Sequence, residues 1–351
     1  MFLVHSTLFR RAVNINVKGT NQVIELCHKI KNLEALIHVS TAYCTKIKNN
    51  IQETICKESM SADHIMAASE WMDEDAFSSL SKFLFAGRPT SYHYTKSLAE
   101  NLLFEKAKDL PAAIIRPSII VAAHRDPFPG WIDNYNGPSG FLLALGKGII
   151  RTLHGYPNNI SDIIPVDIVA NCMIVAAFKI GQEKKMNEPM IVNCTSGQLN
   201  PITWGQIQNF SLPFLIKYPT SFMFRYPSCH ISSNRFLHLF LLHLEHNIPA
   251  FLVDLLFKVT GHEPFLGQIF QKVNRTTKAL EPFTLNEWTW QNQNLCSLMN
   301  FLSDHDKECF LFDVRKVDWI TFMENYVLGI RRFLLKENIS NLQKARTNLN
   351  R

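Results

Sequence analysis

The 351-residue sequence lacks the cysteine pattern and the charge blocks that define several protein classes. Its eight cysteines are scattered and form no Cys-x-x-Cys pair and no Cys/His cluster with zinc spacing, so we expect no metal site and reduced thiols. The net charge of +6 is mild, and no block of Lys and Arg interleaved with aromatic residues is present. Nucleic acid is therefore not expected as a partner.

We also expect no secretory signal and no segment that spans a bilayer. The nearest candidate is the segment 236–259, which is interrupted by several charged residues and by Pro249. We expect a pair of buried amphipathic helices that are broken at Pro249. An apolar face that lies on a membrane surface is the alternative.

Hydrophobic residues make up 46% of the chain, and in the first 200 residues they alternate between two patterns. Short runs rich in β-branched residues predict buried strands at 35–39, 112–121 and 190–194. Helical periodicity lies between them, which predicts a parallel sheet with crossover helices and thus an α/β fold. After about residue 205 the pattern is helical and rich in aromatic residues, and no convincing strand follows.

Tyr92 and Lys96 lie four residues apart at the start of a helical pattern, which places them on one helical face. A phenol has a reference pKa of about 10, and a nearby ammonium favours its ionised form. Such a pair can donate a proton to a carbonyl that receives a hydride. A solvated helix face is the alternative interpretation.

Two hydroxyl side chains, Ser40 and Thr41, directly follow the predicted strand at 35–39. Substrates of parallel α/β sheets bind at the carboxyl ends of the strands, where a hydroxyl can donate a hydrogen bond to a carbonyl oxygen. Capping of the strand end is the alternative role. The sequence leaves open which of the two hydroxyls acts.

With these residues in hand, the chain resembles the extended short-chain dehydrogenase/reductase superfamily and, within it, the alcohol-forming fatty acyl-CoA reductases. The resemblance covers residues 10–335. It is most specific at 127–140, where a Pro-Gly-Trp and an Asn-Gly-Pro sequence occur together. Further matches lie at 16–20 (Asn-Val-Lys-Gly-Thr), 38–43 (His-Val-Ser-Thr-Ala-Tyr), 92–96, 164–167, 232–235 and 325–326.

The resemblance implies a partial Rossmann-like parallel sheet in residues 1–230, a mostly helical domain at 231–340 and a polar tail at 341–351. It implies that long-chain fatty acyl-CoA is reduced by NADPH to a primary alcohol, in lipid metabolism. It also implies an intracellular location at peroxisomal or endoplasmic-reticulum membranes, with peripheral membrane contact through the helical domain as an open option.

Roles for individual residues follow from the same resemblance. Tyr92 is the expected general acid, Lys96 the partner of the phenol and of the cofactor ribose, and Ser40 or Thr41 the donor to the oxyanion. The positions expected to contact the cofactor are Asn16, Lys96, Pro117 and Ile119.

One feature departs from the family. Its members open with a strand, a Gly-x-x-Gly-x-x-Gly turn and a helix that binds the cofactor pyrophosphate. In this sequence the first glycine is Gly19, in a different motif, so we expect an N-terminally truncated fold that lacks the first strands and the glycine-rich loop. An inactive remnant, or a protein that binds acyl-CoA or a partner, is therefore the alternative function. A dehydrogenase acting on sterols or sugars is a weaker one, because segment 127–140 argues against it.

Overall fold

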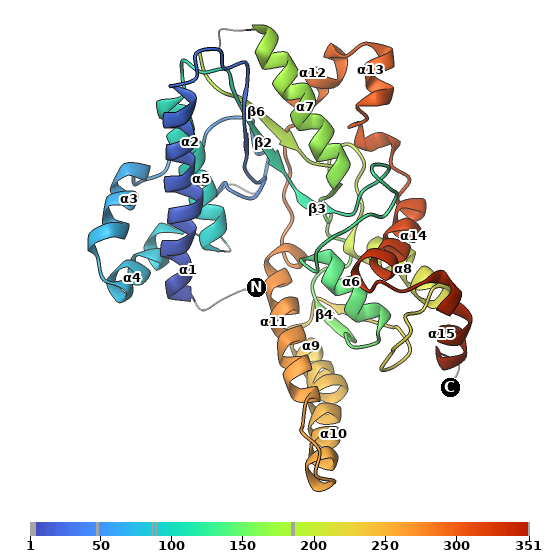
Figure 1. Ribbon diagram of the computed structural model, residues 1–351. Coiled ribbons are helices and arrows are strands. Elements are labelled where there is room, and N and C mark those ends of the chain that lie inside the picture. Colours follow the sequence, from blue (N-terminus) through green and yellow to red (C-terminus); the bar gives the residue numbers. More distant parts are fainter. Residues whose placement is uncertain (1–4, 47–48, 86, 89, 184–186, 350–351) are drawn as a thin grey trace. The chain divides into compact units, whose positions relative to one another are not determined.

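The computed structural model describes residues 5–46, 49–85, 87–88, 90–183 and 187–349, which form two compact units (Figure 1). Each unit is assembled from three separate stretches of chain. Unit 1 contains Met1–Ser118, Ile168–Gln198 and Trp288–Asp313, and unit 2 contains Ile119–Asp167, Leu199–Glu287 and Val314–Arg351. The predicted domain boundary after residue 230 falls inside unit 2 and remains a prediction.

The centre of unit 1 is a parallel sheet in the order β1-β2-β6. Strand β1 (Leu36–Val39) pairs with β2 (Ala112–Pro117), which pairs with β6 (Met190–Cys194). Every residue of β2 is buried, as expected for a central strand covered on both faces. The predicted parallel α/β arrangement is confirmed.

Helices lie on both sides of this sheet, with α1, α2 and α5 on one side and α7 and α12 on the other (Figure 1). Phe9, Val13 and Val17 share a hydrophobic core with Leu98 and Leu102 of α5. The helices of unit 1 are α1 (His5–Ala12), η1 (Val13–Lys18), α2 (Gly19–Cys27), α3 (Ala62–Trp71), α4 (Glu74–Leu84), α5 (Ser91–Lys106), α7 (Val166–Glu183, which begins in unit 2), α12 (Gln293–Phe301) and α13 (Asp304–Cys309).

The strand predicted over 112–121 is wrong in its extent. It ends at Pro117, and β3 (Ile119–Val121) pairs with β5 (Ile163–Pro165) in unit 2. Proline has no N–H to donate to the ladder, and beyond it the Ile119 N–H donates to Asp162 at 3.2 Å. The break therefore divides one apolar run between the two units.

Unit 2 contains a second parallel pair, β4 (Thr152–His154) with β7 (His230–Ser232). The expectation of no strand after residue 205 is thus wrong, because a strand as short as β7 gives no periodic signal. The remaining elements of unit 2 are mostly helical, as predicted for this part of the chain. They are α6 (Pro138–Gly146), α8 (Trp204–Lys217), α9 (Arg235–Leu242), η2 (His243–Asn247), α10 (Ile248–Val259), α11 (Leu266–Thr284), η3 (Val314–Lys316), α14 (Trp319–Gly329), η4 (Ile330–Leu334), η5 (Ile339–Asn341) and α15 (Leu342–Leu349).

Helices α9, η2 and α10 run on as one helix from Arg235 to Val259, so the predicted pair of buried helices broken at Pro249 is wrong. The expectation of no run long enough to span a bilayer is wrong as well, by length and composition alone, because the helix continues through Pro249. Pro249 lies in the first turn of α10, directly after the wide turn η2, where an opened helical ladder tolerates a missing N–H. Most of this helix is exposed, and its buried residues are His238, His246 and Ala250.

The predicted polar tail at 341–351 also carries structure. Residues 342–349 form the short helix α15, in which Arg346 donates to the carbonyl oxygen of Lys217 at 2.9 Å. Residues 350–351 lie outside the described part of the chain.

Candidate active site

The first two turns of α5 present Tyr92 and Lys96 on one face, as the spacing predicts. The Lys96 ammonium lies 5.9 Å from the centre of the Tyr92 ring. Tyr92 is 45% exposed, whereas Tyr94, two residues along, is fully buried against Phe9 and Phe85. Of the two tyrosines in the motif, only Tyr92 can reach a molecule from solvent.

The electrostatics of this pair differ from the sequence-based expectation. Desolvation raises the pKa of Tyr92, and the nearby Cys44 adds to the increase, so the expected lowering by Lys96 is not found. Lys96 Nζ instead donates to the carbonyl oxygen of Val39 at 2.8 Å. Burial lowers the pKa of Lys96, and the Glu100 carboxylate opposes that shift.

The two candidate hydroxyls directly follow β1, and both are buried. The Ser40 N–H donates to the Ile115 carbonyl at 2.8 Å, which continues the pairing with β2 past the end of β1. Thr41 Oγ1 accepts a hydrogen bond from the Tyr43 N–H at 3.3 Å. Ser40 Oγ makes no hydrogen bond of normal geometry to the described residues. It lies near enough to Glu100, however, to help lower the pKa of that carboxyl group. Ser40 is therefore the hydroxyl with more capacity to bind a substrate oxygen.

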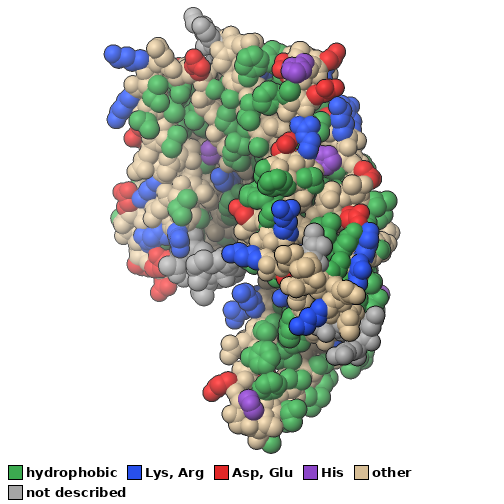
Figure 2. Space-filling model, turned by 45° about the vertical axis from the view of Figure 1, so that its right-hand side comes forward, with side chains coloured by type: hydrophobic (Ala, Val, Ile, Leu, Met, Phe, Trp, Pro, Cys, Tyr) green, Lys and Arg blue, Asp and Glu red, His purple; other side chains and the backbone are tan. Residues whose placement is uncertain are grey.

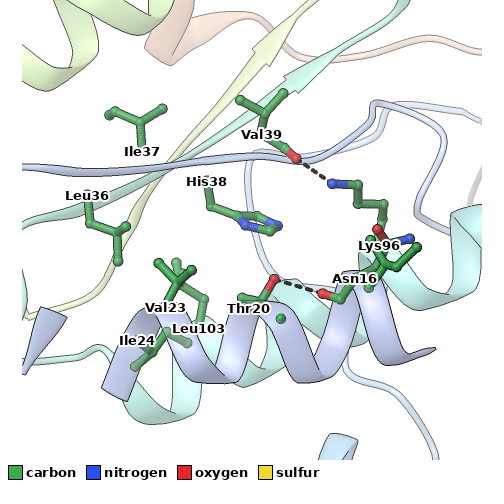
Figure 3. A pocket seen from close by; sticks show the side chains of 12 residues that line it. Asn16, Thr20, Val23, Ile24, Leu36, Ile37, His38, Val39, Lys96 and Leu103 are labelled. Atoms are coloured by element: carbon green, nitrogen blue, oxygen red, sulfur yellow. Dashed lines mark hydrogen bonds between the residues drawn. The ribbon is translucent and has the colours of Figure 1, made fainter. Parts of the chain in front are cut away.

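A pocket of about 490 Å³ lies between β1 and α2, with Lys96 at one end (Figure 3). Asn16 lines it, and its Nδ2 donates to Thr95 Oγ1 on α5 at 2.9 Å, which fixes η1 against the first turn of α5. The residues that line the pocket are Ile15, Asn16, Gly19, Thr20, Val23, Ile24, Leu36, Ile37, His38, Val39, Lys96 and Leu103. The structure thus brings two of the predicted cofactor-contact residues, Asn16 and Lys96, to one cavity.

The other two predicted contact residues do not line this pocket. Pro117 ends β2 and is buried, and its carbonyl oxygen accepts from the Ala42 N–H at 2.9 Å. Ile119 begins β3, which belongs to unit 2. Their contact with a cofactor remains a prediction.

His38 is a pocket residue that sequence reasoning did not single out. Its ring points from β1 toward α2 (Figure 3), and its Nε2 is buried with no hydrogen-bond partner among the described residues. Burial lowers its pKa to about 4, with a further contribution from Lys96, so the ring is neutral at neutral pH. The sequence could have indicated His38, because it lies two residues before Ser40 and residues two apart in a strand share a face.

A buried ion pair beneath the site was also missed. Glu100 on α5 receives two hydrogen bonds from Arg116 on β2, at 2.9 and 2.6 Å, and one from Cys44 Sγ at 3.3 Å. Burial raises the pKa of Glu100, but the Arg116 guanidinium outweighs it and keeps the carboxyl ionised. Two features of the sequence could have indicated this pair. Glu100 follows Lys96 by one helical turn, and Arg116 lies inside an otherwise apolar strand.

A second buried pair ties the loop before α5 to the same region. The Arg88 guanidinium pairs with the Glu58 carboxylate, and its Nε donates to the Cys44 carbonyl at 2.5 Å. Ser97 on α5 also donates to Glu58. Both ion pairs therefore bond to Cys44 and to α5, the helix that carries Tyr92 and Lys96.

Two family models match the chain, both described as male sterility protein. One, an NAD-binding model, matches residues 4–173, and the other matches residues 245–337. Among solved structures, the terminal R domain from the myxalamid PKS-NRPS biosynthetic pathway superposes with a TM-score of 0.53 at 15% identity, over 90% of this chain and 62% of that one. That likeness shows the fold alone.

Curated relatives are considerably more similar in sequence. The chain is 39% identical to "Fatty acyl-CoA reductase 1" of Xenopus laevis and 38% identical to the Homo sapiens protein of that name, in each case over 97% of this chain. It is 34% identical to "Fatty acyl-CoA reductase 2" of Mus musculus over the same share. The chain spans 66% of the length of these relatives.

Proposed function

Because the chain belongs to the male sterility protein family, which includes the fatty acyl-CoA reductases, we propose that it reduces long-chain fatty acyl-CoA to a primary fatty alcohol with NADPH. One observation carries the proposal. An exposed tyrosine lies one helical turn from a lysine that lines a pocket, and that lysine bonds to the residue before a buried serine at the end of a parallel strand.

The residues at the pocket fit one end of a nicotinamide cofactor. Lys96 is the one lysine or arginine among the described lining residues, and together with Asn16 it offers hydrogen-bond donors to ribose hydroxyls. The sequence contains no Gly-x-x-Gly-x-x-Gly turn for the pyrophosphate. When bound, the cofactor supplies the hydride. NADPH rather than NADH is part of the proposal and rests on the family resemblance.

Tyr92 donates the proton. The phenol is protonated at neutral pH, as a proton donor must be. Because its pKa is raised, it gives up that proton only as negative charge develops on a carbonyl oxygen beside it. Reduction to the alcohol consumes two hydrides and two protons and releases CoA as the thiol. In the first reduction, the proton that Tyr92 gives to the carbonyl oxygen leaves again as the hemithioacetal collapses to the aldehyde, and the departing CoA thiolate takes up one proton. In the second reduction, the proton that Tyr92 gives stays on the alcohol oxygen.

Ser40 and Lys96 position the reacting groups. The Ser40 hydroxyl, which has no hydrogen bond of normal geometry within the described residues, donates to the developing oxyanion. Lys96 is fixed by the Val39 carbonyl, in the residue before Ser40, so the end of β1 and the first turn of α5 are held together. Thr41, which already accepts from Tyr43, shapes the strand end.

We further propose that the protein acts in lipid metabolism at peroxisomal or endoplasmic-reticulum membranes. Support comes from the family resemblance and from the long apolar helix of unit 2, which suits a protein whose substrate and product both partition into lipid.

A second function, binding of acyl-CoA without reduction, is favoured by one observation, the lack of a glycine-rich turn in the 351 residues. One assay separates the two functions. The chain is incubated with palmitoyl-CoA and either NADPH or NADH, cofactor oxidation is followed, and the lipid product is identified by mass spectrometry. The same chain, extended at its N-terminus by a glycine-rich strand–turn–helix unit, is assayed in parallel.

Hexadecanol formed with NADPH, in either version, supports the reductase. Saturable palmitoyl-CoA binding with no alcohol or aldehyde in either version supports the binding function and contradicts the reductase.

A further inference from the structure

The helix that runs through α9, η2 and α10 carries an apolar stripe along its outer face. Successive members are three or four residues apart or adjacent, so they share one helical face over the whole length. Each is between 46% and 84% exposed. The apolar stripe consists of Phe236, Phe240, Leu244, Ile248, Phe251, Leu252, Leu255, Leu256 and Val259.

Neither acidic side chain on this helix is free to repel an anionic surface. Asp254 accepts hydrogen bonds from the N–H groups of Phe265, Leu266 and Gly267, at 3.0, 2.9 and 2.7 Å, and so caps α11. Glu245 pairs with Arg225 at 3.1 Å and with Arg151 at 3.5 Å. Figure 2 shows hydrophobic side chains gathered over the projecting end at the bottom of the view, with few charged groups among them.

The exposed charges of the surrounding segment are mostly basic. Between Arg235 and Thr284, one exposed residue is acidic, Glu263, and five are basic. The five basic residues are Arg235, Lys258, Lys272, Arg275 and Lys278. Long basic side chains place their methylenes on an apolar surface and their charges among lipid headgroups. The combination of an apolar face with a basic surround is complementary to an anionic lipid surface.

The opposite face of the helix is held by unit 2. His238 bonds to Thr152 at 3.0 Å, His246 Nε2 accepts from the Arg151 N–H at 3.0 Å, and Ala250 packs with Leu266 and Phe270. By length and composition, the helix from Arg235 to Val259 could also cross a membrane. For a helix tied to protein along one face, an interfacial position fits better than a crossing one, because crossing would carry the charges of Arg151, Arg225 and Glu245 into hydrocarbon.

We propose that the apolar stripe is a membrane-docking surface, which lies in the headgroup region of an anionic lipid bilayer with its aromatic and leucine side chains among the upper acyl chains. This inference deepens the membrane location proposed above and rests on that part of the proposed function. It needs no turnover, so vesicle binding and the reductase assay can fail independently.

Vesicle co-sedimentation tests the proposal, with vesicles of pure phosphatidylcholine or of phosphatidylcholine with phosphatidylserine. The variant Phe236→Ser/Phe240→Ser/Phe251→Ser removes three exposed rings and should lower vesicle binding on the order of 100-fold. Trp71→Ser/Phe83→Ser is the matched control, since these residues are 76% and 83% exposed in unit 1. It should bind as the unmodified chain does. Circular dichroism verifies that each variant is folded.

A second variant, Lys272→Glu/Arg275→Glu/Lys278→Glu, should weaken binding to the phosphatidylserine vesicles at least about tenfold and leave binding to pure phosphatidylcholine unchanged. Equal vesicle binding by the unmodified chain and the Phe variant overturns the proposal. So does a dimer, seen by analytical ultracentrifugation, that the Phe variant converts to monomer without any vesicle binding, because the stripe would then be an interface between two copies.

Discussion

Helix α5 of unit 1 and the helix α9–η2–α10 of unit 2 invert the usual relation between composition and burial. Helix α5 is rich in polar residues, yet every residue from His93 to Leu103 except Lys96 is buried. The apolar helix of unit 2 buries His238, His246 and Ala250 and exposes its phenylalanines and leucines. A polar helix can be buried where each polar group finds a partner, and an apolar helix stays exposed where the residues around it offer no cover.

The residues that bond to the buried polar side chains of α5 also surround the candidate site. Glu100 is held by Arg116, Ser97 by Glu58, and Thr95 by Asn16. Tyr92 is the exception, because it stays 45% exposed at the start of the helix. The difference between the two helices therefore separates the candidate active site from the proposed membrane-docking surface.

The largest expected effect comes from comparing an exposed and a buried tyrosine within α5. On the proposed function, Tyr92→Phe should lower turnover about 10²- to 10⁴-fold, because the proton donor is lost, with little change in acyl-CoA binding. The matched control is Tyr94→Phe, which removes a buried hydroxyl that has no hydrogen-bond partner among the described residues. It should leave activity near that of the unmodified chain. If the two variants lose activity equally, the assignment of the acid is wrong.

The next effect tests whether pairing is what allows α5 to be buried. Arg116→Met leaves the Glu100 carboxylate buried without its cation and should lower the free energy of unfolding by about 3–5 kcal/mol. Lys18→Ala, which breaks the partly exposed pair with Glu70, should cost no more than about 1 kcal/mol. Chemical denaturation of both variants measures the difference. Equal losses would contradict the role given to the buried pair.

The pH dependence of stability provides a third comparison. Burial lowers the pKa of His38 to about 4, and burial with Arg88 does the same for His93. Between about pH 6.5 and pH 4 the unfolded chain binds more protons than the folded one at these residues. Stability should therefore fall as the pH falls through this window, by up to about 1.4 kcal/mol per pH unit for each ring.

Denaturation curves of His38→Gln and of the control His262→Gln, whose ring is exposed, measure this effect. His38→Gln should flatten the dependence between pH 6.5 and 4, and His262→Gln should not. An unchanged slope in His38→Gln would show that this ring is already charged or solvated in the folded protein.

The smallest effect is expected in the apolar helix. Phe251 is 66% exposed, so Phe251→Ser should change the free energy of unfolding in solution by no more than about 0.5 kcal/mol. Leu98→Ala in α5, where the side chain is fully buried, should cost about 2–5 kcal/mol. Thermal or chemical melts test both. A large loss for Phe251→Ser would mean that the stripe packs against protein in solution.

Several elements could be predicted because their signals are local. The strands at Leu36–Val39 and Met190–Cys194 follow from short β-branched runs, and the helix that carries Tyr92 and Lys96 follows from spacing. The break at Pro117 could also have been predicted, since proline cannot extend a central ladder, but the change of partner strand after it could not. Strand β7 exists only because His230–Ser232 pairs with β4, from which it is separated by the 75 residues between His154 and His230.

The sequence by itself determined the family, the α/β class and the pairing of Tyr92 with Lys96 on one face, because motif identity and helical period are properties of neighbouring residues. Tertiary structure alone decided which polar groups are buried together and which apolar groups are left outside. Glu100 and Arg116 are 16 residues apart and become an ion pair only once α5 packs on β2. The direction of the Tyr92 pKa shift and the exposure of the apolar stripe were decided in the same way. Desolvation and packing depend on what surrounds a residue in space, which residue order along the chain does not specify.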